Sequence, residues 1–283
     1  MKTTLLVLSV MLVQAMAQGS GEARAQATIA KAPDAEKAAP APKIESPLPF
    51  AEGETLTYEI NFSKFIISGE AGELRLKVAK ASHPGKPGLI ELRAEAVSKG
   101  FFPKIFGIKV RDEFTSQVSS LDFGLQASNK LLEEGKVRVE QKSVVDRDAG
   151  RVRFTHRDLT RDEDEPRVQE AESPSWLQDM LSACYFIRTQ KLNEGDVISI
   201  PISDEGKVYN IEVVVGKREE VKVDAGKFKA IKLDAKIFDG RYIRRGGEMF
   251  VWVTDDARRT PVRARIKTNG ATVGIELKRA KHS

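Results

Sequence analysis

The chain has 283 residues, 41% of them hydrophobic and 31% charged, which is typical of a globular protein and excludes a membrane-spanning bundle or a disordered polymer. The net charge of +5 results from 46 basic and 41 acidic residues that alternate along the sequence, as Glu91, Arg93 and Glu95 do. Because nucleic-acid binding requires clustered cations, the alternation indicates a solvated sheet face and no nucleic-acid partner.

The N-terminus has the pattern of a secretory signal. Lys2 precedes the apolar run 5–13, and Ala15 and Ala17 are the small residues that a signal peptidase requires. We therefore expect processing after Ala17, with Ala25 as the alternative position. The run is shorter than the roughly 18–20 residues needed to span a bilayer, and no cysteine follows it for lipid attachment. The expected mature protein is periplasmic and has no transmembrane segment.

Residues 18–49 are rich in Ala, Pro, Lys, Gln and Gly and contain almost no large apolar side chain. Such a segment cannot bury enough surface to offset the entropy cost of ordering it. We expect a disordered tether from 18 to 49, followed by one β-rich domain over residues 50–281.

From Phe50 onward the hydrophobic pattern has period two, which is typical of half-buried strands. The pattern predicts strands over 56–62, 74–78, 90–96, 209–215, 231–237, 262–266 and 273–277. Turn sequences rich in Asn, Asp and Gly lie at 148–150, 204–206, 224–226 and 269–270, so neighbouring strands should pair antiparallel. Residues 249–253 are apolar on both faces, which predicts a central strand covered on both sides.

One segment, residues 175–190, has the spacing of an amphipathic helix. Its apolar positions recur at three and four residues: Leu177, Met180, Leu181, Cys184 and Ile187. Ser175 is the expected N-cap, and Asp179 is expected in the first turn. The charged stretch 157–173 before it is expected to be a mobile loop. The sequence thus predicts a mainly β fold with a single inserted helix.

No pattern indicates catalysis or metal binding. The three histidines, His83, His156 and His282, are isolated, and the single cysteine, Cys184, fits a packed position on the helix. The pairs Asp255-Asp256 and Asp112-Glu113 could serve acid–base chemistry or cation binding, but turn chemistry is the favoured interpretation for such Asp residues. Glycine-rich phosphate loops are absent as well. We expect a non-enzyme without cofactor or metal.

The segment 100–108 is unusually aromatic for a connector, with Phe101, Phe102 and Phe106. It could be a lid over a hydrophobic cavity, a membrane-touching patch, or a buried crossover that closes one end of the sheet. The candidate ligand or lid positions are therefore aromatic or apolar side chains of this segment, the helix and the 249–253 strand: Phe101, Phe102, Phe106, Trp176, Met180, Tyr185 and Trp252.

Several short motifs resemble, in order, the exported bacterial family known as domain of unknown function 3108. They are Gly53-Glu54 with Leu56 and Tyr58; Asp112-x-Phe114-x-Ser116; Gln178-Asp179-Met180-Leu181-Ser182-Ala183 with Tyr185 and Arg188; Gly226-Lys227-Phe228; and Val251-Trp252-Val253-Thr254-Asp255-Asp256 with Pro261-Val262. The resemblance covers nearly all of residues 50–277. It implies an exported envelope protein of unestablished role and transfers no catalytic residue.

A long antiparallel sheet with an inserted helix is also similar to the curved half-barrels of lipoprotein carriers such as LolA and LolB. This fold-level likeness implies one large, strongly curved, barrel-like sheet, and it does not fix function. Two hypotheses follow. The protein binds an apolar small molecule or lipid on the concave face beneath the helix, or it is a structural module that docks an envelope protein partner through a sheet edge. Hydrolysis of an envelope polymer by Asp residues has no support in the sequence.

Overall fold

The computed structural model of the protein describes residues 43–44, 46–80, 88–101, 103–104, 107–161, 165–238, 242–243, 246–268 and 270–282. Of the sequence predictions above, the signal peptide, its cleavage site and most of the tether lie outside these residues. So do Phe102 and Phe106 of the aromatic segment.

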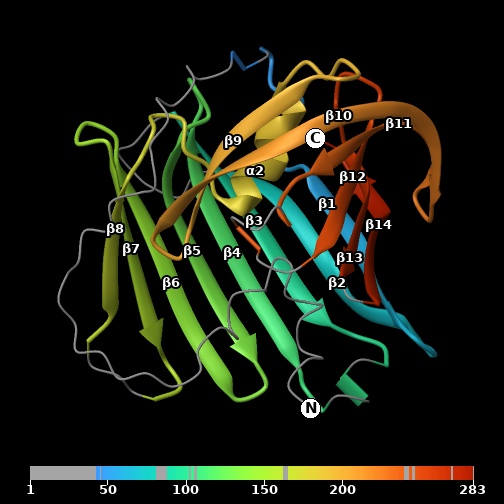
Figure 1. The fold of residues 1–283 in the computed structure, drawn as a ribbon, viewed down its shortest axis with the longest axis horizontal. Helices are drawn as coiled ribbons and strands as arrows, with labels where there is room; N and C mark the ends of the chain where they lie inside the picture. Colours follow the sequence, from blue (N-terminus) through green and yellow to red (C-terminus); the bar gives the residue numbers. More distant parts are fainter. Residues whose placement is uncertain are drawn as a thin grey trace.

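The fold is one antiparallel sheet of fourteen strands that curves around a short helix (Figure 1). The strands are β1 (Thr55–Lys64), β2 (Ile67–Lys80), β3 (Leu89–Ser98), β4 (Val110–Ser119), β5 (Leu125–Glu134), β6 (Val137–Asp146), β7 (Arg151–Asp158), β8 (Arg167–Glu172), β9 (Val197–Asp204), β10 (Lys207–Val223), β11 (Gly226–Ala235), β12 (Gly247–Thr254), β13 (Pro261–Thr268) and β14 (Ala271–Lys281). The predicted mainly β fold with one helix is confirmed.

Two meanders make up the sheet. Strands β1 to β8 pair in sequence, strands β9 to β14 pair in sequence, and β1 pairs with β14 to join the two halves. The free edges are therefore β8 and β9, which do not pair with each other. The turn after β9 and strand β10 approach β8: a Cβ added at Gly206, which has a positive φ of 75°, would lie 2.4 Å from the Gln169 side chain. The sheet is strongly curved without closing into a barrel.

The period-two pattern explains which side of each strand is buried. In β1 the apolar residues Leu56, Tyr58, Ile60 and Phe62 alternate with more exposed polar residues, and all four are at most 5% exposed. The same alternation places apolar side chains of β2, β13 and β14 on the concave face. Six of these seven predicted strand segments lie entirely within observed strands. The seventh, 231–237, extends two residues past the end of β11.

The helical prediction is right in type and wrong at its start. Helix α2 spans Met180–Phe186 and continues as the 3₁₀ turn η1 (Ile187–Thr189), so its N-cap is Asp179 and not Ser175. The Asp179 carboxylate accepts the backbone N–H of Ser182, whose hydroxyl in turn accepts the N–H of Asp179. Residues 175–176 form a turn instead, and Gln178 is bridged to β9 because it hydrogen-bonds Pro201 and Ser203 through its backbone.

The predicted mobile loop 157–173 is also corrected. Residues 157 and 158 belong to β7, and residues 167–172 form the edge strand β8. Opposite charges face each other across this pair: Arg151 is opposite Glu172, and Arg153 is opposite Glu170. Charged side chains exposed on both faces are compatible with an edge strand, because only one of its sides needs a partner.

Candidate ligand-binding cavity

A cavity of about 150 Å³ lies between helix α2 and the concave face of the sheet. Its walls come from α2, from β1 to β3, and from β9 to β14, so both halves of the sheet contribute. The lining side chains include Ile60, Leu76, Ile200, Ile211, Leu233, Val251, Ala264, Ile266 and Ile275. The long β1–β14 seam therefore forms its floor, and the helix covers it (Figure 1).

The cavity lining is almost entirely apolar. The polar side chains among the lining residues are the Tyr58 hydroxyl, which donates a hydrogen bond to the Pro261 carbonyl at 2.9 Å, the thiol of Cys184, and Arg263, which is paired with Glu276 at 2.8 Å. Burial raises the pKa of Tyr58 well above its ordinary value, so this hydroxyl stays neutral. An apolar cavity of this volume does not hold ordered water and can accept an apolar group the size of benzene.

Of the predicted ligand positions on the helix and just before it, one lines the cavity and two lie in the core. Met180 lines the cavity beside Cys184. Tyr185 packs edge-on against Phe50 with ring centroids 5.0 Å apart, and Trp176 packs against Phe186 at 5.7 Å. Tyr185 and Trp176 are almost fully buried and hold the helix in place.

Trp252 lies on the opposite face of β12 from the cavity. Met249, Val251 and Val253 line the cavity, whereas Trp252 is stacked under cationic side chains of Lys232, Arg263 and Arg265, at 5.8–5.9 Å from its ring centroid. Its indole N–H also donates to Glu219. The prediction that this strand is covered on both sides holds for Trp252. On the face away from the cavity, however, the cover consists of the long charged side chains described above and not of another sheet or helix.

Phe101 follows β3 in the chain and is half-buried beside the start of β2. Its backbone N–H donates to the Glu70 carbonyl at 3.3 Å, and its ring lies against Gly69, where an added Cβ would come within 3.0 Å of it. Phe101 packs on the core cluster and does not line the cavity described above. Its lid role stays a prediction.

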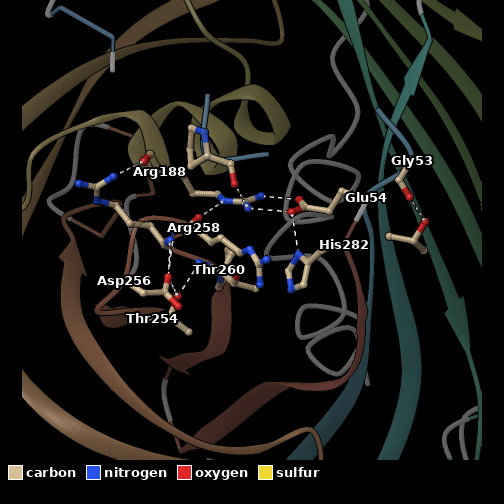
Figure 2. A network of polar contacts seen from close by, with 12 residues as sticks. Gly53, Glu54, Arg188, Thr254, Asp256, Arg258, Thr260 and His282 are labelled. Carbon is tan, nitrogen blue, oxygen red and sulfur yellow. Dashed lines mark hydrogen bonds and ion pairs between the residues drawn. The ribbon is translucent and has the colours of Figure 1, made fainter. Parts of the chain in front are cut away.

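A buried ion pair fastens the helix to the rest of the domain (Figure 2). Arg188, in η1, makes a bidentate contact with Glu54 at 2.6 and 2.9 Å, and both side chains are at most 2% exposed. The guanidinium also donates to the carbonyl of Arg258 and stacks 4.9 Å from the Phe50 ring centroid. His282 lies 3.3 Å from the same Glu54 carboxylate. We call Arg188, Glu54 and His282 the helix clasp.

The clasp is surrounded by ordinary turn chemistry. Asp256 accepts the N–H groups of Arg258 and Arg259, and the Thr254 hydroxyl accepts the N–H of Thr260 (Figure 2). Asp256 therefore has the capping role expected of an Asp in a turn. Among the described residues, no three His, Cys, Asp or Glu side chains are arranged to hold a metal ion. No helix in the same part of the chain has the length and apolarity that membrane crossing would require.

Two groups of buried polar residues escaped the sequence interpretation. Lys130 on β5 forms a 2.7 Å ion pair with Asp204 at the end of β9, and Tyr242 donates to the same carboxylate. On β4 and β5, Asp112 and Glu134 are buried carboxylates near each other; burial and the Glu134 charge raise the pKa of Asp112 to about 8. Cross-strand register brings Asp112 and Glu134 together, whereas Lys130 and Asp204 meet across strands that do not pair; a sequence shows neither.

The family model described as "Protein of unknown function (DUF3108)" matches residues 57–278. The chain belongs to this family. No curated protein matches the chain. The family assignment confirms the sequence resemblance and names no activity.

Solved structures give a further comparison. A β-barrel-like protein of domain of unknown function DUF1849 from Brucella abortus is similar with a TM-score of 0.56 and 8% identity, over 83% of this chain and 99% of that one. A candidate exported protein with a YmcC-like fold from Bacteroides fragilis has a TM-score of 0.34, 11% identity and coverage of 83% and 98%. A candidate lipoprotein from Parabacteroides distasonis has a TM-score of 0.33, 12% identity and coverage of 83% and 97%. The first likeness shows the fold alone.

The motifs that carry the DUF3108 resemblance converge around the helix. Glu54 and Arg188 form the ion pair of the clasp, and the Ser116 hydroxyl donates to the Asp179 carboxylate of the N-cap at 2.6 Å. Tyr58 reaches across to the carbonyl of Pro261. The contacts of Glu54, Arg188, Ser116 and Asp179 hold α2 in position over the cavity. These motif residues therefore have a structural role.

The environment of Cys184 gives the first prediction. The thiol faces the cavity, and burial raises its pKa to about 11. Because only the thiolate reacts, we expect a charged aromatic disulfide reagent at pH 8 to label the native protein at least about a hundredfold more slowly than the denatured protein. The release of the reagent's chromophore measures both rates. Native labelling within tenfold of the denatured rate would mean that this face of the helix is open to water.

Proposed function

We propose that the protein is a non-enzymatic envelope protein that binds an apolar, lipid-like ligand in the cavity beneath α2. The observation that carries the proposal is the cavity itself: its lining is apolar, and the one hydroxyl within it is already hydrogen-bonded. Such a site offers no group that could activate water or a nucleophile, whereas it favours the burial of an alkyl or aryl group by about 25 cal/mol per Å².

The proposed location in the periplasm rests on the N-terminal sequence. Lys2, the apolar run 5–13 and the pair Ala15 and Ala17 have the features of a cleavable signal. A carrier or receptor for apolar molecules fits such a compartment, because these molecules cross an aqueous layer there only when they are shielded from water.

The test fills the cavity and measures uptake of an environment-sensitive fluorescent fatty acid. Ala264 lines the cavity from β13, opposite Val251 and Ile275 in the sheet register. Ala264→Phe should abolish probe uptake, because the new ring occupies the ligand volume, and should cost about 1–3 kcal/mol of stability if the cavity does not fully absorb it. Val144→Phe is the matched control, since Val144 is 58% exposed on β6, away from the cavity.

The wild-type protein and Val144→Phe should bind the probe equally, and Ala264→Phe should melt cooperatively without binding it. Native mass spectrometry of protein isolated after export should in addition detect a co-purifying apolar molecule in the wild type only. If the wild type binds neither probe nor native ligand, the carrier role is wrong. The alternative is then a docking module, for which the exposed edge strand β8 provides unpaired backbone groups.

A further inference from the structure

The turn between β1 and β2 exposes three consecutive apolar side chains to solvent. Phe65 is 86% exposed, Ile66 is 99% exposed and Ile67 is 37% exposed. Exposed apolar residues are common singly, but a run of large ones at the tip of a hairpin is not explained by the folding of the domain. None of the three residues lines the cavity beneath α2.

The turn also departs from the chemistry that its geometry favours. Lys64 pairs with Ile67, so Phe65 and Ile66 form a two-residue hairpin loop, and Phe65 has a positive φ of 53°. Such loops favour glycine at a first position with positive φ, and asparagine or glycine elsewhere. A bulky aromatic residue at that position carries strain, and among the described residues the ring interacts with Lys64, whose Nζ lies 6.0 Å from the ring centroid. Local strain without a stabilising contact points to a role outside the fold.

Further lysines lie at the same end of the sheet as this turn. The β1–β2 turn is at the lower right of Figure 1, and the β5–β6 turn is at the lower end farther to the left, with β3 and β4 between them. Lys109 is tied to the β5–β6 turn, because its carbonyl accepts the N–H of Gly135 at 2.8 Å. Lys64, Lys104, Lys109 and Lys136 form no ion pair with any residue that the structure describes, and the last three are exposed.

The charge at this end is not uniform. The acidic run at residues 162–165 belongs to the connection between β7 and β8, which leaves the sheet at the same end but five strands away from β2. Glu133, which is closer, is paired with Arg138 at 3.0 Å. The lysines therefore lie at the same end of the sheet as the apolar tip, and Glu70, three residues past Ile67 on β2, is an acidic side chain close to the tip in the chain.

We propose that the β1–β2 turn docks the protein on an anionic lipid bilayer, with Phe65 and Ile66 inserted among the lipid chains and Lys64, Lys104, Lys109 and Lys136 against the headgroups. Apolar side chains that enter the interface and lysines that meet anionic headgroups add their contributions, and neither alone gives stable attachment. The proposal does not depend on the cavity, and it assigns a partner surface to the opposite end of the sheet from α2 (Figure 1).

The test is co-sedimentation with vesicles of phosphatidylcholine containing phosphatidylglycerol, using the protein as isolated after export. Replacing Phe65→Gly together with Ile66→Asn gives the turn a sequence that it favours, so the variant should fold at least as well as the wild type and lose vesicle binding. Lys64→Gln should weaken binding to anionic vesicles about fivefold. Leu121→Asn is the matched control, because Leu121 is 87% exposed in the turn between β4 and β5, at the other end of the sheet.

The expected pattern is binding by the wild type and by Leu121→Asn, loss of binding by the turn variant, and little binding of any of them to vesicles of phosphatidylcholine alone. Three results would overturn the proposal: no binding of the wild type to anionic vesicles, equal binding by the turn variant, or an equal loss caused by Leu121→Asn. None of these outcomes bears on uptake of the fatty-acid probe, so the docking and cavity proposals can fail separately.

Discussion

Replacing Arg188→Met should lower the stability of the domain by about 3–5 kcal/mol, because it leaves the Glu54 carboxylate buried without its bidentate partner. For a domain of this size the loss corresponds to a fall in melting temperature of roughly 10 °C. Thermal and denaturant unfolding followed by circular dichroism measure it. Helix α2 should also loosen, because Arg188 joins it to residues 49–54 and to the turn at Arg258.

Two further variants show whether the unpaired charge is the cause. The double variant Glu54→Leu with Arg188→Met removes both charges and should recover most of the loss, since a well-packed apolar pair often replaces a buried ion pair without cost. Lys227→Met breaks the exposed pair with Glu220, both partners being more than 60% exposed, and should change stability by less than about 1 kcal/mol. If Arg188→Met also lowered stability by less than about 1 kcal/mol, the clasp would not be an important contributor to the stability of the domain.

Replacing Asp112→Asn should raise the stability of the protein at pH 8 by about 3–5 kcal/mol. Asp112 is fully buried, its Oδ1 accepts the N–H of Glu133, and its Oδ2 has no hydrogen-bond partner among the described residues. Burial, and then the neighbouring Glu134 carboxylate, raise the pKa of Asp112 to about 8. An Asn amide keeps the first hydrogen bond, carries no charge and can donate to Glu134.

The pH dependence distinguishes this cause from simple repacking. The raised pKa means that the folded protein keeps a proton that the unfolded chain releases above about pH 4. Asp112 therefore lowers the stability progressively between about pH 4 and pH 8, and the advantage of Asn should grow over that window and nearly vanish at pH 4. Glu140→Gln, at a partly exposed carboxylate on β6 that pairs with Lys142 at 2.8 Å, is the control and should show little change. An Asn advantage equal at both pH values would refute the proposed titration.

Strands β1–β3 and β10–β14 were predictable because each of these half-buried strands records its own two faces in the sequence, whereas the pattern did not assign segments to β4–β9. In β1 the alternation of Leu56, Tyr58, Ile60 and Phe62 is sufficient without any knowledge of the partner strand. Strand β8 was missed because an edge strand that is exposed on both faces has no apolar alternation. The opposite charges of Arg153 and Glu170 do face each other across β7 and β8, but this pairing can be recognised only when the register of the two strands is known.

The helix and its surroundings were predictable only in part. The spacing of Met180, Cys184 and Ile187 identified a helix, but Leu177 shares that spacing and lies outside it, because Gln178 pairs with β9. The cavity was a hypothesis from the sequence, and no periodicity distinguishes a lined cavity from a filled core. The clasp was not predicted, since Glu54 and Arg188 meet across 134 positions of sequence.

The joining of β1 to β14 has a consequence for how the chain folds. Strand β1 lies inside the finished sheet, yet its partner is the last strand to be synthesised, so β1 remains an open edge until the whole chain is available. An open edge with a row of apolar residues is prone to pair with other chains. Pairing of such distant segments is also slow, because a very long loop must close before the contacts form. Folding of this protein should therefore wait for its C-terminal strand, and a chain that lacks β14 should aggregate as a half-sheet.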